Sequence, residues 1–240
     1  MISNIVLFSD REDVKHCIAY LRKKGVPILY IVSNKLKDSN YNLEIRKNIV
    51  DRDYKNSILI SYYYGSLIEK KIFNRFKVAI NFHPAPLPLY RGVKCGVHAI
   101  LNEEKKFGVS CHIITERFDD GEILGKLEFP IDDIETGYSI NIKSRKKLYD
   151  LFKRYINKYI FGENVNMYEI LDNISYNLSS PTYFSGKDFE KLKCLDGINP
   201  YSVYAKKIIR AMWHPKYMDT YYTNKKKEKI YLSHTPAEVS

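Results

Sequence analysis

The segment NFHPAPLPLYRG, which starts at Asn81, holds the side chains of this chain best suited to acid–base chemistry. Asn81 and His83 end an apolar run and alternate with Phe82, so a strand here places both side chains on one face. An amide and an imidazole side by side can donate hydrogen bonds to one oxygen atom and stabilise the negative charge on a carbonyl under attack. The alternative is that Asn81 caps the loop and His83 is a hydrogen-bonded core histidine. The prolines that follow make the loop stiff, and the sequence leaves open which of their peptide bonds are cis.

A carboxylate follows at the end of a later predicted strand, where Asp119 lies in the segment FDDGEIL. It could orient His83 and accept the proton that an attacking amine loses. Taken alone, Asp119-Asp120-Gly121 is also typical of an ordinary tight turn. Both interpretations of this segment therefore stay open on local grounds.

The surrounding elements predict an α/β fold. Buried apolar runs over residues 2–8, 26–32, 57–63 and 77–82 alternate with helical patterns, the first of which places Val14, Cys17, Ile18 and Leu21 on one face and the second of which covers residues 66–73. Such alternation implies a Rossmann-like parallel sheet covered on both faces, with ligands at the carboxyl ends of its strands. No GxGxxG or P-loop follows any of these runs, so neither a dinucleotide nor a nucleoside triphosphate site of the usual kinds is expected.

The second half of the chain changes character near Ser180. Strands over residues 108–115 and 122–131, the end of a helix over 99–103 and a long helix over 138–161 complete the first part. A helix over residues 201–212 and a hairpin within 217–232 follow in the second part. We therefore expect a catalytic domain over residues 1–180 and a small C-terminal α+β subdomain over 181–240.

Composition excludes several classes of protein. The chain has 240 residues with 45% hydrophobic and 28% charged side chains, which rules out wholesale disorder. Its four cysteines form no CxxC pair, so no zinc site or disulfide framework is expected. No signal peptide or membrane span is visible, and we expect a cytoplasmic protein without a membrane partner.

Positive charge is concentrated in the last hundred residues. The formal net charge is +11, of which residues 1–140 carry +3 (21 basic, 18 acidic) and residues 141–240 carry +8 (18 basic, 10 acidic). This surplus is compatible with an anionic partner such as a nucleic acid, and equally with genome base bias and solubility.

Two segments in the same order and spacing, NFHPAPLPLYRG and FGVSCHIITERFDDGEIL, resemble the formyltransferase superfamily that uses 10-formyltetrahydrofolate as cosubstrate. In that family the Asn and His of an NxH motif and the Asp of a DxG motif are catalytic. The resemblance therefore assigns catalysis to Asn81, His83 and Asp119, with Asp120 at a variable position. It implies attack of a substrate amine on the formyl carbon, with no metal.

The upstream segment ILISYYYGSLIEKKIF resembles the strand and turn that hold the pterin ring in this family. The simpler explanation for Tyr62–Tyr64 is an aromatic core. The resemblance implies that main-chain groups of two stretches line the folate pocket, around Tyr64, Gly65, Ser66 and Ile68 and around Thr115 to Arg117.

Three acceptor classes compete within the superfamily. Methionyl-tRNA formyltransferases usually carry a larger C-terminal domain, and glycinamide ribonucleotide transformylases have a glycine-rich phosphate loop where this chain has SDRE from Ser9. Ala85 and the segments PTYF (181–184) and WHPKY (213–217) are similar to bacterial sugar N-formyltransferases. This implies formylation of a nucleotide-linked amino sugar, dTDP-4-amino-4,6-dideoxy-D-glucose, for O-antigen or another surface glycan, by a homodimer joined through the C-terminal hairpin.

Two departures from that pattern are visible: His98 stands where Trp is common, and residues 218–220 replace a more usual Pro-Gly-Ala. The substrate contacts we expect are Arg11 and Lys94 for the diphosphate and Trp213 or Tyr217 against the base or sugar. Solvated surface charge and core packing are the simpler explanations for these four side chains. The alternative function is a methionyl-tRNA formyltransferase-like enzyme that acts on a nucleic-acid-borne amine. The basic Lys225–Lys229 stretch would suit contact with the phosphates of such a nucleic acid.

Overall fold

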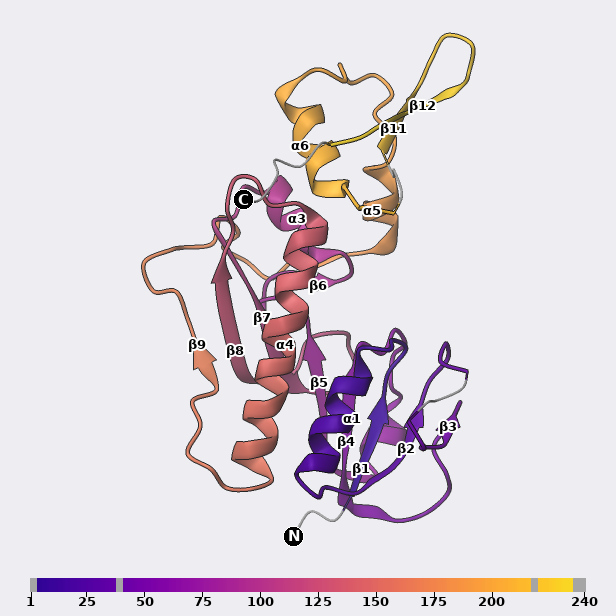
Figure 1. The fold of residues 1–240 in the computed structure, drawn as a ribbon, viewed down its shortest axis with the longest axis vertical. Coiled ribbons are helices and arrows are strands. Elements are labelled where there is room, and N and C mark those ends of the chain that lie inside the picture. Colours follow the sequence, from indigo (N-terminus) through magenta and orange to yellow (C-terminus); the bar gives the residue numbers. More distant parts are fainter. Residues whose placement is uncertain (1–3, 38–40, 217–219, 235–240) are drawn as a thin grey trace. The chain divides into compact units, whose positions relative to one another are not determined.

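An eight-stranded sheet runs through the computed structural model, which describes residues 4–37, 41–216 and 220–234 (Figure 1). Its order is β3-β2-β1-β4-β5-β7-β8-β9. The bounds are β1 (Asn4–Phe8), β2 (Ile28–Val32), β3 (Ile45–Arg46), β4 (Tyr54–Tyr62), β5 (Phe76–His83), β7 (Lys106–Ile113), β8 (Ile123–Pro130) and β9 (Tyr168–Glu169). The α/β class and the C-terminal hairpin predicted from the sequence are confirmed.

The sheet is mostly parallel but mixed. The pairs β1–β2, β1–β4, β2–β3, β4–β5 and β8–β9 are parallel, whereas β5–β7 is antiparallel. Parallel neighbours need a crossover that returns the chain to the end where the first strand began. The chain between β5 and β7 instead re-enters the sheet from the end at which β5 stops.

The chain forms two compact units, each with its own segments. Unit 1 comprises Met1–His83, Val109–Leu127 and Lys147–Glu169, and unit 2 comprises Pro84–Gly108, Glu128–Lys146 and Ile170–Ser240. The domain boundary near Ser180 stays a prediction.

The sheet of unit 1 has an apolar core on each face, because its strands alternate between the two. On β1, Ile5 and Leu7 belong to one core and Val6 and Phe8 to the other. The first core is covered by α1 (Val14–Lys23) and the unit 1 part of α4 (Gly137–Tyr159). Figure 1 shows these two helices side by side, and Tyr20 of α1 contacts the rings of Tyr149 and Phe152 of α4. The four apolar residues expected on one face of the first helix are all buried.

Helix α2 (Lys70–Phe73) is much shorter than the helix expected over residues 66–73. Hydrogen bonds from neighbouring loops hold the preceding residues: Asn34 Nδ2 bonds Tyr64 Oη and Ser66 Oγ, and Gly65 N bonds Asp10 Oδ2. Side chains distant in sequence thus override the local helical pattern.

Unit 2 packs around its own apolar cluster, which involves α3 (Cys95–Leu101), α5 (Gly186–Lys191) and α6 (Val203–Met212). The hairpin pairs β11 (Thr220–Thr223) with β12 (Lys229–Leu232) in antiparallel register, and β10 (Tyr183–Phe184) pairs with β6 (Arg91–Gly92) in parallel. His98, the departure noted above, stacks on Phe184 with ring centres 4.0 Å apart and planes 12° apart.

Two buried carboxylates of unit 2, Glu104 and Glu128, bind neighbouring segments through hydrogen bonds and an ion pair. Glu104 accepts hydrogen bonds from Tyr90 Oη at 2.8 Å and from the backbone N of Asn177 at 2.8 Å. Glu128 forms a buried ion pair with Lys106 at 2.9 Å. Among the described residues, no helix is long and apolar enough to cross a membrane.

Candidate functional site

The carboxyl end of β5 carries Asn81 and His83, and its antiparallel neighbour β7 supplies the residues that lie opposite them. In the register of this pair, Asn81 lies opposite His112 and His83 opposite Ser110. Residues two apart on a strand share a face, as expected for Asn81 and His83. Main-chain pairing therefore fixes the position of both side chains.

Asp119 brings the two predicted segments together. Its Oδ1 atom lies 3.2 Å from His83 Nδ1 and 3.3 Å from Asn81 Nδ2. The side chains of His83 and Asp119 are only 5% and 8% exposed, so their interaction is weakly screened by water. The cluster lies wholly in unit 1.

The turn that presents Asp119 has two backbone requirements. Asp119 is left-handed, with φ of 53°, a conformation that Asp tolerates better than most residues and that recurs at functional sites. A Cβ atom on Gly121 would lie 1.8 Å from the carbonyl oxygen of Ile113. Only glycine permits this close approach, which explains the glycine of the DDG turn.

His112 completes the cluster, and sequence reasoning missed it. Its Nδ1 lies 2.8 Å from the carbonyl oxygen of Ile113, which only accepts hydrogen bonds, so Nδ1 carries the proton. In the neutral ring Nε2 is then an acceptor, 3.0 Å from Asn81 Nδ2. The available signal was its place inside FGVSCHIITERFDDGEIL, the segment that also contains Asp119.

The amide of Asn81 therefore has two partners, His112 Nε2 at 3.0 Å and Asp119 Oδ1 at 3.3 Å. The bond to Asp119 is the longer and weaker one. A carbonyl oxygen placed at the site could take over that hydrogen while His112 keeps the amide oriented.

Cys111, the neighbour of His112, is not suited to act as a nucleophile. Burial raises the pKa of its thiol, so the reactive thiolate is disfavoured. In the described part of the chain, no group of three or more His, Cys, Asp or Glu side chains has the geometry to hold a metal ion.

The residues predicted around the pterin lie on the turn after β4. Gly65 and Ser66 are exposed, and Tyr64 packs edge-on against Phe8 with ring centres 5.3 Å apart. The side chain of Ile68 belongs to the second core of unit 1, so only its main chain is open to a ligand role.

The other predicted stretch, Thr115 to Arg117, follows β7. Thr115 Oγ1 bonds the main chain of Arg117, which closes a short turn immediately before Asp119. Two apolar side chains flank these turns and are exposed: Leu67 at 47% and Phe118 at 45%. The turns thus combine exposed backbone with exposed apolar surface.

The expected substrate contacts are spread over both units. Arg11, in unit 1, stacks its guanidinium 4.7 Å from the ring centre of Tyr63 and pairs with Asp13 at 3.3 Å. Burial raises the pKa of Tyr63, and the charge of Arg11 opposes this effect.

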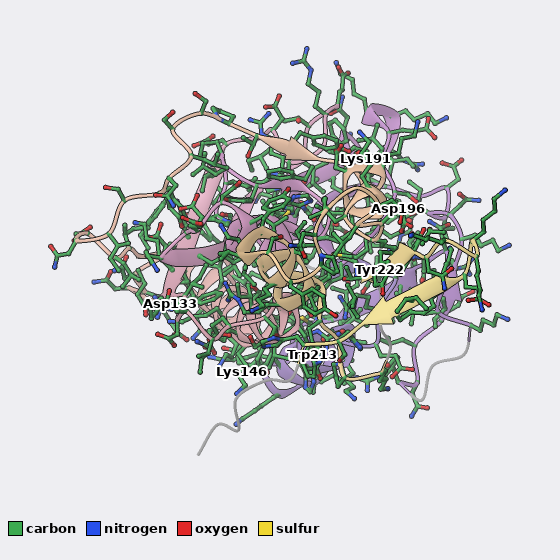
Figure 2. All side chains as sticks on the ribbon, turned by 90° about the horizontal axis from the view of Figure 1, so that it is seen from above. Asp133, Lys146, Lys191, Asp196, Trp213 and Tyr222 are labelled. Atoms are coloured by element: carbon green, nitrogen blue, oxygen red, sulfur yellow. The ribbon has the colours of Figure 1, made fainter. Side chains whose placement is uncertain are left out.

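In unit 2, exposed Lys94 begins α3 with a φ of 56° and lies 4.8 Å from the ring centre of Phe189. Trp213, labelled in Figure 2, follows α6 and contacts Tyr138 edge-on. Tyr217 lies outside the described residues. Contact of Arg11 and Lys94 with the diphosphate, and of Trp213 with the base or sugar, stays a prediction.

The loop after His83 contains one cis peptide bond, Leu87–Pro88, among the described residues. The sequence alone had left open which of the prolines in this loop follow a cis peptide bond.

Two curated relatives match part of the chain. The methionyl-tRNA formyltransferase of Treponema denticola is 33% identical over 135 residues, which cover 54% of this chain and 39% of that protein. The GDP-perosamine N-formyltransferase of Brucella melitensis is 29% identical over 142 residues, which cover 58% and 51%. The alignments thus span only about two fifths to one half of those relatives.

Solved structures resemble the chain over a greater length. A 4-N formyltransferase from Francisella tularensis superposes with a TM-score of 0.80 at 21% identity, covering 99% of both chains. An N-formyltransferase from Helicobacter canadensis, solved with folinic acid and dTDP-3-aminofucose, gives 0.68 at 22% identity, covering 94% of this chain and 85% of that one. These likenesses show a shared fold.

The sequence profile of a family described as formyl transferase matches residues 2–156. This range includes the whole cluster of Asn81, His83, His112 and Asp119. On this match over more than half of its length, the chain belongs to the formyl transferase family.

Proposed function

We propose that the protein transfers the formyl group of 10-formyltetrahydrofolate to the amine of a nucleotide-linked amino sugar. The observation that carries this proposal is the cluster in which His83 Nδ1 and Asn81 Nδ2 lie 3.2 and 3.3 Å from the same oxygen of Asp119. Donors of this kind beside a carboxylate suit attack of an amine on an acyl carbon.

The residues around the cluster fit a folate. Exposed main chain at Gly65 and Ser66, and the exposed apolar side chains of Leu67 and Phe118, offer the mix of backbone donors and apolar walls that suits a flat heteroaromatic ring. Bound 10-formyltetrahydrofolate would supply the electrophilic formyl carbon.

Each residue of the cluster then has a distinct task. Asn81 donates its amide hydrogen to the formyl oxygen in place of its longer bond to Asp119. His83 directs Nδ1 at Asp119, whose carboxylate stabilises the protonated ring. The Nε2 atom of His83 is then able to donate a hydrogen bond to the formyl oxygen. Asp119 accepts, directly or through water, the proton that the amine loses. As the new C–N bond forms, the bond from the formyl carbon to N10 of the folate would break, and this proton balances the one that N10 takes up.

The finer acceptor that we propose is dTDP-4-amino-4,6-dideoxy-D-glucose, used for O-antigen or another surface glycan. Support comes from the likeness to the Francisella 4-N formyltransferase over 99% of both chains and from the dTDP-sugar in the Helicobacter complex. The GDP sugar in the name of the Brucella relative makes the nucleotide the first variable to test.

We also propose a homodimer joined through the hairpin β11–β12. Tyr222 and Leu232 pack against the apolar cluster of the hairpin's own unit, but Ile230 at 37% and Tyr231 at 51% stay exposed and offer apolar surface to a second copy. Light scattering of the purified protein measures its mass in solution.

The test of function supplies 10-formyltetrahydrofolate together with dTDP-, UDP- or GDP-linked amino sugars, or methionyl-tRNA, and detects formylated product by mass spectrometry. We expect product on one sugar nucleotide. Formylation of methionyl-tRNA alone would favour the second candidate, which the 33% identity to the Treponema enzyme supports.

Substitutions test the roles of the cluster. Asn81→Ala, His83→Ala and Asp119→Ala should each lower kcat/KM by about 100-fold or more. His16→Ala, at an exposed position of α1, is the control and should leave kcat/KM unchanged. Turnover retained by all three cluster variants would contradict the mechanism.

A further inference from the structure

Asp10, two residues beyond the end of β1, is a nearly buried carboxylate with three hydrogen-bond donors. Its Oδ2 accepts from Gly65 N at 2.9 Å, and its Oδ1 accepts from Asn34 N at 2.8 Å and Ser33 Oγ at 3.1 Å. The residue is 9% exposed. The donors come from the loops after β4 and β2, so a single carboxylate joins the carboxyl ends of three adjacent strands.

The place of Asp10 in the sheet is where open α/β sheets bind ligands. β1 lies between β2 and β4, and the chain builds the sheet outward from β1 in both directions. Main-chain bonds extend this pairing past the strand, from Ser9 N to Val32 O at 3.0 Å and from Asp10 N to Tyr63 O at 3.1 Å. The bond between Asp10 and Gly65 therefore crosses the point at which the strand order reverses, which is the usual ligand crevice.

A second set of bonds holds the same turn. The side-chain amide of Asn34 bonds Tyr64 Oη at 3.1 Å and Ser66 Oγ at 3.0 Å, while Asp10 holds the backbone N of Asn34. Since residues 64–66 belong to neither β4 nor α2, no helix or sheet ladder orients their main chain. Hydrogen bonds from Asp10 and Asn34, together with the packing of Tyr64 on Phe8, hold their conformation.

Asp10 does not serve the more ordinary task of capping a helix. The N-cap residue of α1 is Asp13. The neighbouring cation Arg11 pairs with Asp13 and stacks on Tyr63. The hydrogen bonds of the Asp10 carboxylate instead point to the loops that border the proposed folate pocket.

We propose that Asp10 is a positioning residue for folate: it holds residues 64–66 in the conformation that receives the pterin ring. The proposal rests on the proposed function, because it requires that this turn binds 10-formyltetrahydrofolate. Asp10 takes no part in the chemical step, which belongs to Asn81, His83 and Asp119 on other strand ends.

The test is Asp10→Asn in the full chain. An Asn side chain can keep an oxygen toward Asn34 N, but its amide group then faces Gly65 N, so two donors oppose each other. We expect the Kd for 5-formyltetrahydrofolate, measured by calorimetric titration, to rise about tenfold. The KM for 10-formyltetrahydrofolate should rise in parallel, while kcat at saturating folate and the KM for the acceptor stay near wild type.

Asp53→Asn is the matched control. Its carboxylate also accepts a backbone hydrogen bond, from Lys55 N at 2.9 Å, but it is exposed and lies at the opposite end of β4. It should bind folate as the wild type does. Asn34→Ala is the second variant, at a surface position, and it removes the bonds to Tyr64 and Ser66 without changing a charge.

The outcomes separate the two proposals. A raised folate Kd in Asp10→Asn and Asn34→Ala, with kcat retained, supports the positioning role. Wild-type Kd in both variants overturns it and leaves the proposed function intact. If the wild type itself binds no 5-formyltetrahydrofolate, the proposed function falls and the positioning role falls with it.

Discussion

Replacing His112 tests whether this residue orients the amide of Asn81. A Phe side chain removes the acceptor of the 3.0 Å bond from Asn81 Nδ2 and the donor of the 2.8 Å bond to Ile113 O. The ring is buried, with its side chain 3% exposed, and Phe is close to it in shape. His112→Phe therefore removes hydrogen bonding while largely preserving packing.

The magnitude follows from the bonds lost. The variant loses two hydrogen bonds, each of which contributes about 0.5–1.5 kcal/mol, and the Asn81 amide keeps only its 3.3 Å bond to Asp119. If about 1–2 kcal/mol of this appears in the transition state, where Asn81 must face the formyl oxygen, kcat/KM falls about 5- to 30-fold. The loss should be in kcat, because the hydrogen bonds of His112 go to Asn81 and Ile113, which belong to neither of the proposed folate turns.

The assay compares His112→Phe, His112→Gln and His112→Asn at saturating folate and acceptor. Gln can place its side-chain oxygen near Nε2 and accept from Asn81, whereas Asn can reach only the Nδ1 side toward Ile113. We expect Gln to retain more activity than Phe or Asn, with thermal stability measured in parallel. Equal kcat in all three variants and the wild type would refute the orienting role.

Two other changes give specific expectations. Gly121→Ala places a Cβ atom 1.8 Å from Ile113 O, so the DDG turn must shift by about 1 Å and kcat/KM should fall about 100-fold. Gly186→Ala is the control, because no atom lies within 4 Å of the added Cβ atom. Equal activity of the two variants would contradict the close-approach argument. Burial lowers the pKa of His98, so the unfolded chain takes up this proton at higher pH than the folded chain, and stability falls as pH drops below about 6.5. Between about pH 7.5 and 5.5 the wild-type Tm should therefore fall further than that of His98→Phe, a variant that keeps a ring against Phe184. Parallel curves of Tm against pH would show that another group causes the pH dependence of stability.

The sequence predicts the elements whose pattern is local and strong. The buried face of α1 and the central strands β1, β4 and β5 lie within a few residues of their expected places, because apolar periodicity alone determines which side chains are buried. Asn81, His83 and Asp119 were also proposed as catalytic from the sequence, through two motifs and their resemblance to a family, and the structure brings the three side chains together.

Features set by distant partners were not predicted. The direction of β7 depends on how the chain returns after β5, and the shortening of α2 depends on Asp10 and Asn34, which come from other strands. His112 was overlooked because a histidine inside a strand carries no signal of its own until the register places it opposite Asn81.

The antiparallel pairing of β5 with β7 determines which changes of sequence would disturb the cluster of Asn81 and His112. The chain leaves unit 1 after His83 and returns to it at Val109, and everything between belongs to unit 2. Because the ladder, and not the length of this excursion, places Asn81 opposite His112, the excursion can change at its exposed positions, such as Val93 and Lys94, without moving that pair. Many of its buried residues, Tyr90, Ile100 and Phe107 among them, belong to the apolar cluster of unit 2, so exchange of the whole excursion would disrupt that core.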